Sequence, residues 1–416
     1  MSTRGDVAAM RALIAEHNEK LAAESPAIAF SAEEYRDRLS ATRTAMSERG
    51  IDVLVVMAPD NMCYLHGYAS RWYHGHSPTV WPSVAATVVH VDSDTFVHFD
   101  SLGERGLLQS TSIAQDIHFF AVYDDHESVL ASFVGELRAR GWLPGRVGVE
   151  LWSHVPNRAV SERIERVLTE GGASIVDATS LLRAVRGIKS AQEVAYIEEG
   201  ARIADIGLEA ARDAIRPGVT ELEVWGAMMH AIAKAGGEPA AIHELVRVGS
   251  IEEGHAIASR RKIAPGDYVV VDPCGVVNHY HGNTSRTFYV GEPPAAALEL
   301  TRIAGAAFDV LCAVAKDGTP VDDVNRALRE FFVDAGIWDL RAWVGGYELG
   351  LSFPPDWVGE FVFTVEDEAA EGAFKAGMVT NFESIFHLPV LDTIIYEPDG
   401  ARALSRLPRE LLAVPC

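Results

Sequence analysis

An internal repeat with an offset of one hundred residues constrains the fold of this chain more than any other feature. Residues 217–237 (PGVTELEVWGAMMHAIAKAGG) resemble residues 317–337 (DGTPVDDVNRALREFFVDAGI). In each copy a helical pattern ends at a glycine, and strand-like sequence follows it. The repeat therefore predicts two related α/β halves that pack around a pseudo-twofold axis, with a site between their sheets.

The N-terminal part of the chain alternates helical and strand-like patterns. Ser31 with Glu34 has the pattern of a capping box and marks the start of a helix. Apolar runs of strand length follow, separated by turn residues. The predicted elements are a helical extension at 1–30, a helix at 32–48, strands at 51–57, 84–91 and 95–101, a helix at 127–140, a strand at 147–151, a helix at 156–170 and a strand at 173–178. This alternation predicts an α/β domain over residues 1–185.

Acidic residues stand in the strand-like segments of a second domain, predicted over residues 186–416. A long helix with a capping box at Ser190 and Glu193 opens this domain. Asp272 ends the apolar run VVV, and Glu383 lies within an apolar strand pattern. An acid in such a place is costly unless it is paired or bound to a ligand. These two acids are therefore candidate functional residues.

Three histidines lie near these acids in the sequence. His255 falls in a loop-like stretch before the strand that ends in Asp272. His279 and His281, in the segment NHYHGNTSRT (278–287), are expected on the same side of a strand because side chains two positions apart share a face. A histidine, with a pKa of about 6.5, can accept and donate a proton at neutral pH.

The polar segments of the second domain, taken in order, resemble the catalytic domain of the M24 peptidase family, which has the pita-bread fold. The resemblance spans about residues 185–405. The segment NMCYLHGYASRW (61–72) is similar to the N-terminal domain of creatinase-like members, and GYELGLSFPPDWVGE (346–360) to the branch that holds creatinase and ectoine hydrolase. The resemblance implies an α/β (α+β) fold with a creatinase-like N-terminal domain and a C-terminal pita-bread domain of pseudo-twofold symmetry.

The metal ligands of this family are largely replaced here. Its metallopeptidases hold a metal pair with Asp, Asp, His, Glu and Glu, and the matching positions of this chain are Asp272, Asn283, Tyr347, Glu383 and Leu391. An amide, a phenol and a leucine are poor substitutes for anionic and imidazole ligands. The resemblance to creatinase and ectoine hydrolase therefore implies metal-independent hydrolysis of a non-peptide C–N bond in a small substrate, with no cofactor.

The resemblance also implies roles for individual residues. His255 aligns with the loop histidine that creatinase-like enzymes use as a general base, and it forms the predicted catalytic set with Asp272 and Glu383. The two acids are expected to hold a cationic nitrogen by charge-assisted hydrogen bonds. The predicted substrate-binding residues are His279, His281, Asn283, Tyr347, Arg71 and Trp72. Arg71 and Trp72 belong to the N-terminal domain and would reach a substrate carboxylate across the interface of a homodimer.

Each of these residues also has an ordinary structural explanation. Asp272 can cap a turn, Glu383 can lie on an edge strand, and the histidines and Tyr347 can serve packing alone. Cys274 fits an inert buried thiol, although it borders the site and a reactive thiol stays open. Three other functions stay open as well: a single-metal lyase or hydrolase, with the metal held by Asp272, Glu383 and His279 or His281; an Xaa-Pro-type metallopeptidase; and a catalytically inactive binding protein.

Net charge and cysteine usage narrow the partners and the location. A formal net charge of −23 opposes binding to nucleic acid or to an anionic membrane. The cysteines show no paired spacing, so neither a disulfide framework nor a zinc site is expected. The sequence has no pattern of a signal peptide or a transmembrane helix. A cytoplasmic protein that acts on a small molecule is therefore expected.

Overall fold

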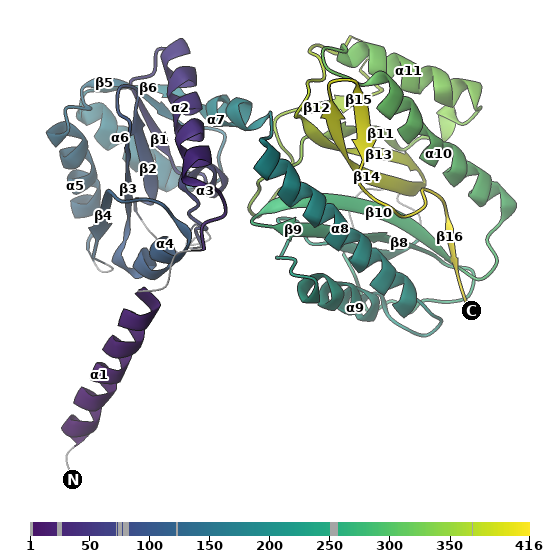
Figure 1. Ribbon diagram of the computed structural model, residues 1–416, viewed down its shortest axis with the longest axis horizontal. Helices are drawn as coiled ribbons and strands as arrows, with labels where there is room; N and C mark the ends of the chain where they lie inside the picture. The colour runs from purple at the N-terminus through teal and green to yellow at the C-terminus, as the bar shows by residue number, and fades with distance from the viewer. Residues whose placement is uncertain are drawn as a thin grey trace. The chain divides into compact units, whose positions relative to one another are not determined.

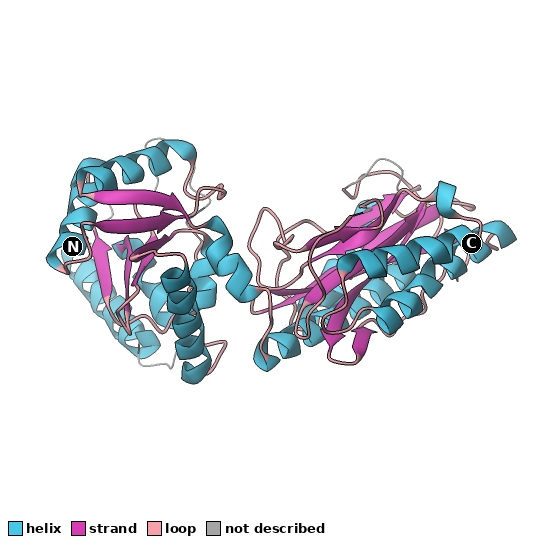
Figure 2. Ribbon diagram, turned by 90° about the horizontal axis from the view of Figure 1, so that it is seen from above, coloured by secondary structure: helices cyan, strands magenta, loops and turns pink. Residues whose placement is uncertain are grey.

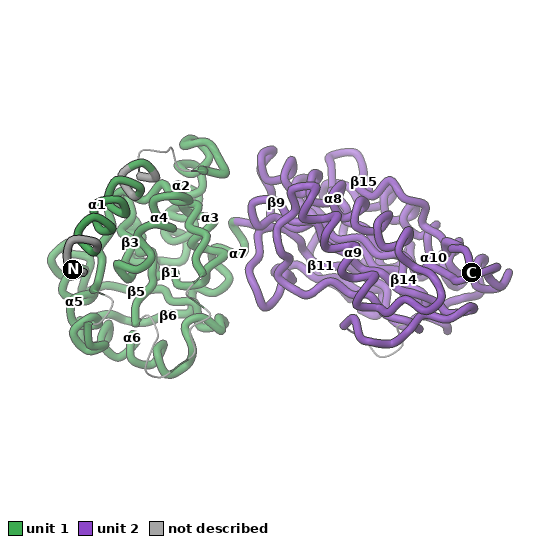
Figure 3. Tube along the Cα trace, turned by 90° about the horizontal axis from the view of Figure 1, so that it is seen from below, with its two compact units in different colours: residues 1–185 green, residues 186–416 purple. Residues whose placement is uncertain are grey.

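The computed structural model describes residues 3–22, 27–71, 73, 77, 83–121, 124–249, 257–367 and 369–416. The chain divides into two compact units, residues 1–185 and residues 186–416 (Figure 3). Each unit is built on a sheet of its own and also contains helices (Figure 2). None of the described helices is long and apolar enough to cross a membrane.

The N-terminal unit is an α/β domain, as predicted. Its strands are β1 (Val53–Val56), β2 (Ala86–His90), β3 (Phe96–Ser101), β4 (Ile117–Phe120), β5 (Gly145–Val149) and β6 (Ala173–Asp177), in the sheet order β4-β3-β2-β1-β5-β6. Its helices are α1 (Thr3–Ala22), α2 (Ala32–Glu48), α3 (Pro59–His66), α4 (Arg105–Thr111), α5 (His126–Ala139), α6 (Arg158–Glu170) and α7 (Thr179–Arg186). The strands predicted at 84–91 and 95–101 are confirmed as β2 and β3, which pair antiparallel, and Ser31 caps α2 through its side chain.

The C-terminal unit consists of one continuous sheet and four long helices that pack on it. The helices are α8 (Ala191–Ala214), α9 (Glu221–Lys234), α10 (Ala295–Val314) and α11 (Val321–Asp334). The main strands are β7 (Leu245–Val248), β8 (Tyr268–Asp272), β10 (Tyr280–Val290), β11 (Trp343–Tyr347), β12 (Val362–Thr364), β13 (Val379–Phe386) and β14 (Leu388–Glu397), in the order β12-β11-β13-β14-β10-β8-β7. Three short strands lie outside this order. Two of them, β9 (Cys274–Val277) and β16 (Leu412–Val414), pair with β10, and β15 (Gly400–Ala403) pairs with β14.

The predicted repeat is confirmed as two structurally equivalent halves. Helix α9 spans 221–234 and helix α11 spans 321–334, so the offset of one hundred residues is kept from end to end. Each half has its own hydrophobic core, one around Met228 and one around Phe332. The two halves meet where β10 pairs with β14, so their strands form one sheet rather than two facing sheets.

Glycines let α8 lie directly against the β9–β10 hairpin (Figure 1). A Cβ on Gly275 would lie 2.0 Å from the carbonyl oxygen of Gly200 in α8, and a Cβ on Gly282 would lie 2.3 Å from the backbone nitrogen of Ala201. Both distances are far below van der Waals contact, so no larger residue fits without a shift of the backbone. This contact fixes the hairpin between Asp272 and Asn283.

Candidate active site

Four strands bring together four of the five positions that match the metal ligands of the M24 family. Asp272 ends β8, Asn283 lies in β10, Tyr347 ends β11 and Glu383 lies in the middle of β13. The Asn283 Nδ2 atom donates to Asp272 Oδ1 at 2.7 Å, and Tyr347 is hydrogen-bonded to Glu383. Asp272, Tyr347 and Glu383 keep part of their surface accessible, so a small molecule can reach them.

The two acids at the centre of the site hold their protons unusually strongly. Burial and the neighbouring charge of Asp272 raise the pKa of Glu383 to about 8, against the opposing hydrogen bonds from Tyr347 and Asn381. Burial also raises the pKa of Asp272 to about 7, with a further contribution from Glu244 and an opposing hydrogen bond from Asn283. At neutral pH the pair is therefore not fully ionised, which is a common property of catalytic carboxyl groups.

Glu244 is a third acid of the site, and the sequence interpretation missed it. It stands directly before β7, whose first residue, Leu245, pairs with Asp272. Its side chain is buried, with 4 % exposed, and its Oε1 atom has no hydrogen-bond partner among the described residues. Burial raises the pKa of Glu244. The available signal was an acid next to the apolar strand LVRV, the same pattern that singled out Asp272.

Neutral side chains orient the two acids. Asn381 donates from Nδ2 to Glu383 Oε1 at 2.5 Å and accepts the backbone N–H of Tyr347 at 2.9 Å. The indole N–H of Trp357 donates to the Tyr347 hydroxyl oxygen at 3.1 Å. The hydroxyl oxygen of Tyr347 is thus an acceptor towards Trp357, which leaves its proton for Glu383. Burial and the neighbouring Glu383 carboxyl raise the pKa of Tyr347 well above its usual value.

The two histidines of the NHYH segment lie in different environments. The expectation that they share one side of a strand is wrong, because His279 has a φ of 65° and lies in the turn between β9 and β10. Its ring stacks on Phe353 with the centroids 4.2 Å apart. His281 lies in β10 with 1 % of its surface exposed, and burial lowers its pKa to about 4. Both ring nitrogens of His281 have partners within the protein, so it has no free nitrogen for a substrate.

Other predicted residues lie elsewhere. His255 and Trp72 fall outside the described residues. Arg71 is an exposed residue of the N-terminal unit, and its substrate contact stays a prediction. Cys274 is fully buried, and burial with the nearby acids raises the pKa of its thiol well above the usual value, which disfavours a reactive thiolate.

The residues at the five family positions do not fit a metal pair. The amide nitrogen of Asn283 points at Asp272, where it donates a hydrogen bond instead of offering a lone pair. The hydroxyl of Tyr347 is engaged with Trp357 and Glu383, and Leu391 has no ligand atom. In the described ranges, no group of three or more His, Cys, Asp and Glu side chains is placed to hold a metal ion.

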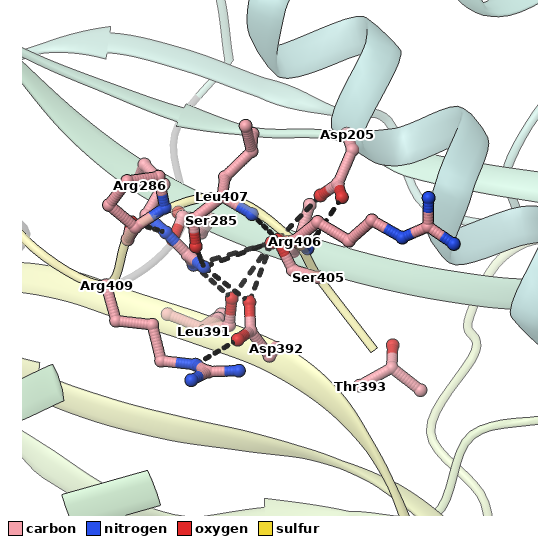
Figure 4. A network of polar contacts seen from close by, with 12 residues as sticks. Asp205, Ser285, Arg286, Leu391, Asp392, Thr393, Ser405, Arg406, Leu407 and Arg409 are labelled. Atoms are coloured by element: carbon pink, nitrogen blue, oxygen red, sulfur yellow. Dashed lines mark hydrogen bonds and ion pairs between the residues drawn. The ribbon is translucent and has the colours of Figure 1, made fainter. Parts of the chain in front are cut away.

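A buried ion-pair network fixes the register of the two strands that meet at the site (Figure 4). Arg286 of β10 and Asp392 of β14 have no exposed surface and pair at 2.8 Å, and Arg409 binds the second carboxylate oxygen of Asp392 at 2.5 Å. Arg286 also donates to the carbonyl oxygen of Leu391 at 2.8 Å. On the neighbouring positions, the Thr393 hydroxyl accepts the N–H of Asn283 and donates to its carbonyl oxygen. The network therefore places Asn283 of β10 beside Thr393 of β14.

Comparisons with known proteins agree with this architecture. Residues 195–403 match the model of metallopeptidase family M24, and residues 38–188 match the creatinase/prolidase N-terminal domain. An ectoine hydrolase from Halomonas elongata is 27 % identical over 92 % of this chain and 98 % of its own length. An Xaa-Pro dipeptidase from Pyrococcus furiosus is 29 % identical over 56 % of this chain and 67 % of its own length. The solved structure of a dipeptidase from Pyrococcus horikoshii matches with a TM-score of 0.77 and 21 % identity, over 91 % of this chain and all of that one.

Proposed function

Because the chain belongs to metallopeptidase family M24, we propose that it is a hydrolase that cleaves a non-peptide C–N bond in a small, nitrogen-rich substrate without a metal pair. The observation that carries this proposal is the donor set of the site. Three of the five metal positions of the family hold Asn283, Tyr347 and Leu391, and the first two of these side chains are hydrogen-bonded within the protein.

The hydrogen-bond acceptors of the site favour a substrate that donates hydrogen bonds. Glu244 Oε1 and Asn283 Oδ1 are buried acceptors without a partner among the described residues. Asp272 and Glu383 add further carboxyl oxygens beside them. A buried acceptor without a partner is costly, so the bound ligand should supply N–H groups, and a positive charge would also stabilise the ionised acids. Amidines, guanidines and protonated amines have this chemistry.

The acid pair supports a general acid–base mechanism. Glu383 holds its proton at neutral pH and can give it to the leaving nitrogen as the C–N bond breaks. Asp272, whose pKa is near 7, can bind the cationic nitrogen as a carboxylate. The predicted base is His255, which would take a proton from the attacking water. The water oxygen then forms the new bond to carbon as the C–N bond breaks. Water loses one proton to the base and the leaving nitrogen gains one from Glu383, so the protons balance.

The substrate named for the ectoine hydrolase relative supports this reading, whereas coverage does not separate it from the dipeptidases. The ectoine hydrolase matches 92 % of this chain at 27 % identity, and a probable dipeptidase from Mycobacterium bovis matches 93 % at 25 % identity. Ectoine is a cyclic amidine, so its ring has the C–N bond and the N–H donors that the site favours. Peptidase activity is the second candidate, and the slightly higher identity of the Xaa-Pro dipeptidase from Pyrococcus furiosus over its shorter match supports it.

A substrate panel with metal analysis tests the proposal. The full chain, purified without chelator, is assayed against ectoine, creatine, an N-acetyl amino acid and an Xaa-Pro dipeptide, with and without added Mn²⁺. The expected result is turnover of an amidine or guanidine at the same rate with and without metal, and a metal content well below one ion per chain. Turnover of the dipeptide alone, dependent on Mn²⁺, would refute the proposal.

A further inference from the structure

We propose that His281 is a positioning residue that holds Glu244 in the site, rather than an acid, a base or a substrate ligand. The inference rests on the proposed function in one respect, because Glu244 is the acceptor for the substrate's N–H group there. Its structural basis is the set of hydrogen bonds around the imidazole ring, all of which involve described residues.

The partners of the ring fix its tautomer. The backbone N–H of Ala241 donates to His281 Nε2 at 3.0 Å, so Nε2 carries the lone pair. The proton is then on Nδ1, which lies 2.9 Å from the carbonyl oxygen of His279 and 3.3 Å from that of Gly350. Carbonyl oxygens only accept hydrogen bonds, so both contacts require the same neutral form. The ring has no nitrogen left for proton transfer.

The ring joins three segments of the C-terminal unit. Ala241 belongs to the loop between α9 and β7, His279 to the β9–β10 turn and Gly350 to the segment after β11. The same loop is anchored a second time, because the Glu238 carboxylate accepts the N–H groups of Asn278 and His279 at 3.0 and 2.9 Å. The loop before β7 is therefore tied to the β9–β10 hairpin at two points.

Glu244 depends on this loop for its position. Its Oε1 atom has no partner among the described residues, and two backbone groups of this loop, those of Glu244 itself and of Ala240, hydrogen-bond to its carboxyl group. Ala240 is the neighbour of Ala241, which His281 holds. A displacement of this peptide therefore moves the carboxyl group that faces Asp272. Misplacement of a reacting or binding group by about 1 Å can reduce the rate by about 10²-fold.

Two substitutions separate positioning from the other roles of a histidine. The Gln side chain of His281→Gln can place its Oε1 near the position of Nε2 and keep the acceptor for Ala241. The Asn side chain of His281→Asn can keep a donor near the position of Nδ1, but it leaves the Ala241 N–H without its acceptor. With ectoine as the probe, we expect kcat/KM to fall by less than about tenfold in the Gln variant and by about 10²-fold in the Asn variant.

Combination with Glu244→Gln tests whether the effect runs through Glu244. If His281 acts by positioning this carboxyl group, His281→Asn should reduce kcat/KM by less than about threefold in the Glu244→Gln background, since coupled sites are not additive. Additive losses, or equal losses in the Gln and Asn variants, would overturn the inference. Thermal unfolding of all variants identifies a loss that comes from unfolding alone.

A measurement without substrate keeps the inference separate from the proposed function. In protein labelled with ¹⁵N-histidine, NMR at pH 7 should show His281 as the neutral Nδ1–H tautomer, and hydrogen exchange of the Ala241 amide should be faster in His281→Asn than in His281→Gln. An Nε2–H tautomer or equal exchange in the two variants would overturn the positioning role. If these results hold but no amidine or guanidine of the substrate panel is turned over, the proposed substrate class fails and the positioning role of His281 stands.

Discussion

Replacing Glu383 by glutamine should stabilise the C-terminal unit at neutral pH, and the gain should vanish in acid. Glutamine has nearly the shape of a protonated glutamate and keeps one acceptor oxygen for the Asn381 amide, which donates to Glu383 Oε1. It removes the ionisable group whose pKa is raised to about 8 by burial and by Asp272. The perturbation therefore isolates the free-energy cost of keeping this carboxyl group protonated.

The sign and the size of the effect follow from proton linkage. The folded unit holds the Glu383 proton up to about pH 8, whereas the unfolded chain releases it above about pH 4.3. Between these values the unfolded state binds fewer protons, so the free energy of unfolding falls as the pH rises. At about 1.36 kcal/mol per pH unit, the cost is about 1 kcal/mol at pH 5 and about 3.7 kcal/mol at pH 7. Because Glu383 and Asp272 titrate as a coupled pair, part of this free-energy cost is shared with Asp272. We therefore expect Glu383→Gln to raise the free energy of unfolding by about 2–4 kcal/mol at pH 7.

Hydrogen exchange provides the assay, because two units need not unfold together. Exchange of the peptide 379–397, which covers β13 and β14, is measured at pH 5, 6, 7 and 8 and corrected for the intrinsic rate. The matched control is Glu371→Gln, an exposed glutamate that should change stability by less than about 0.5 kcal/mol at every pH. A gain that is the same at pH 5 and pH 8, or a loss at pH 8, would show that the acid pair is not held as described.

Three further predictions concern the frame of the site and its ligand. Asp392→Asn leaves the buried Arg286 without its ion pair and should lower the free energy of unfolding by about 3–5 kcal/mol, measured by urea denaturation. The control Asp213→Asn, in an exposed pair, should lower it by less than about 1 kcal/mol. Similar losses in the two variants would contradict the network. Gly282→Ala should destabilise the unit because α8 lies against it, whereas Gly226→Ala in α9, with open space around it, should raise the melting temperature slightly. Acetamidinium binding at pH 7 should release protons as the acid pair ionises, measured by calorimetry in two buffers of different ionisation enthalpy; no buffer dependence would exclude the pair as its site.

Local signals in the sequence were sufficient for most of the helices and strands. Ser190 and Glu193 form a complete capping box at the start of α8, as their spacing predicts. The strand end at Asp272 and the strand around Glu383 are also confirmed. These features depend on residues within a few positions of one another, so the chain alone determines them.

Long-range pairing explains what the sequence did not show. Glu244 lies near Asp272 because β7 pairs with β8, with Leu245 opposite Asp272. No pattern within β7 predicts this register. The hydrogen-bond donor to His281 Nε2 is the backbone N–H of Ala241, forty positions away in the sequence. The strand pattern predicts His279 in a strand, but Asn278 precedes it, and an Asn at the first position of a two-residue hairpin turn favours the positive φ that both residues adopt. That signal was available and was outweighed by the alternation of the strand pattern.

Charge decides which ligand the site can hold. Two divalent cations bring four positive charges, whereas Glu244, Asp272 and Glu383 supply at most three negative ones, and the raised pKa values of Asp272 and Glu383 reduce that number at neutral pH. The amide of Asn283 adds no charge; it donates to Asp272 and Pro273, and its Oδ1 has no partner among the described residues. A ligand with a single positive charge and several N–H groups can satisfy these acceptors while one carboxyl group stays protonated for catalysis. Asn283, which stands where the resemblance places the second aspartate of the family, is thus the residue on which the proposed preference for an organic cation over a pair of metal ions most depends.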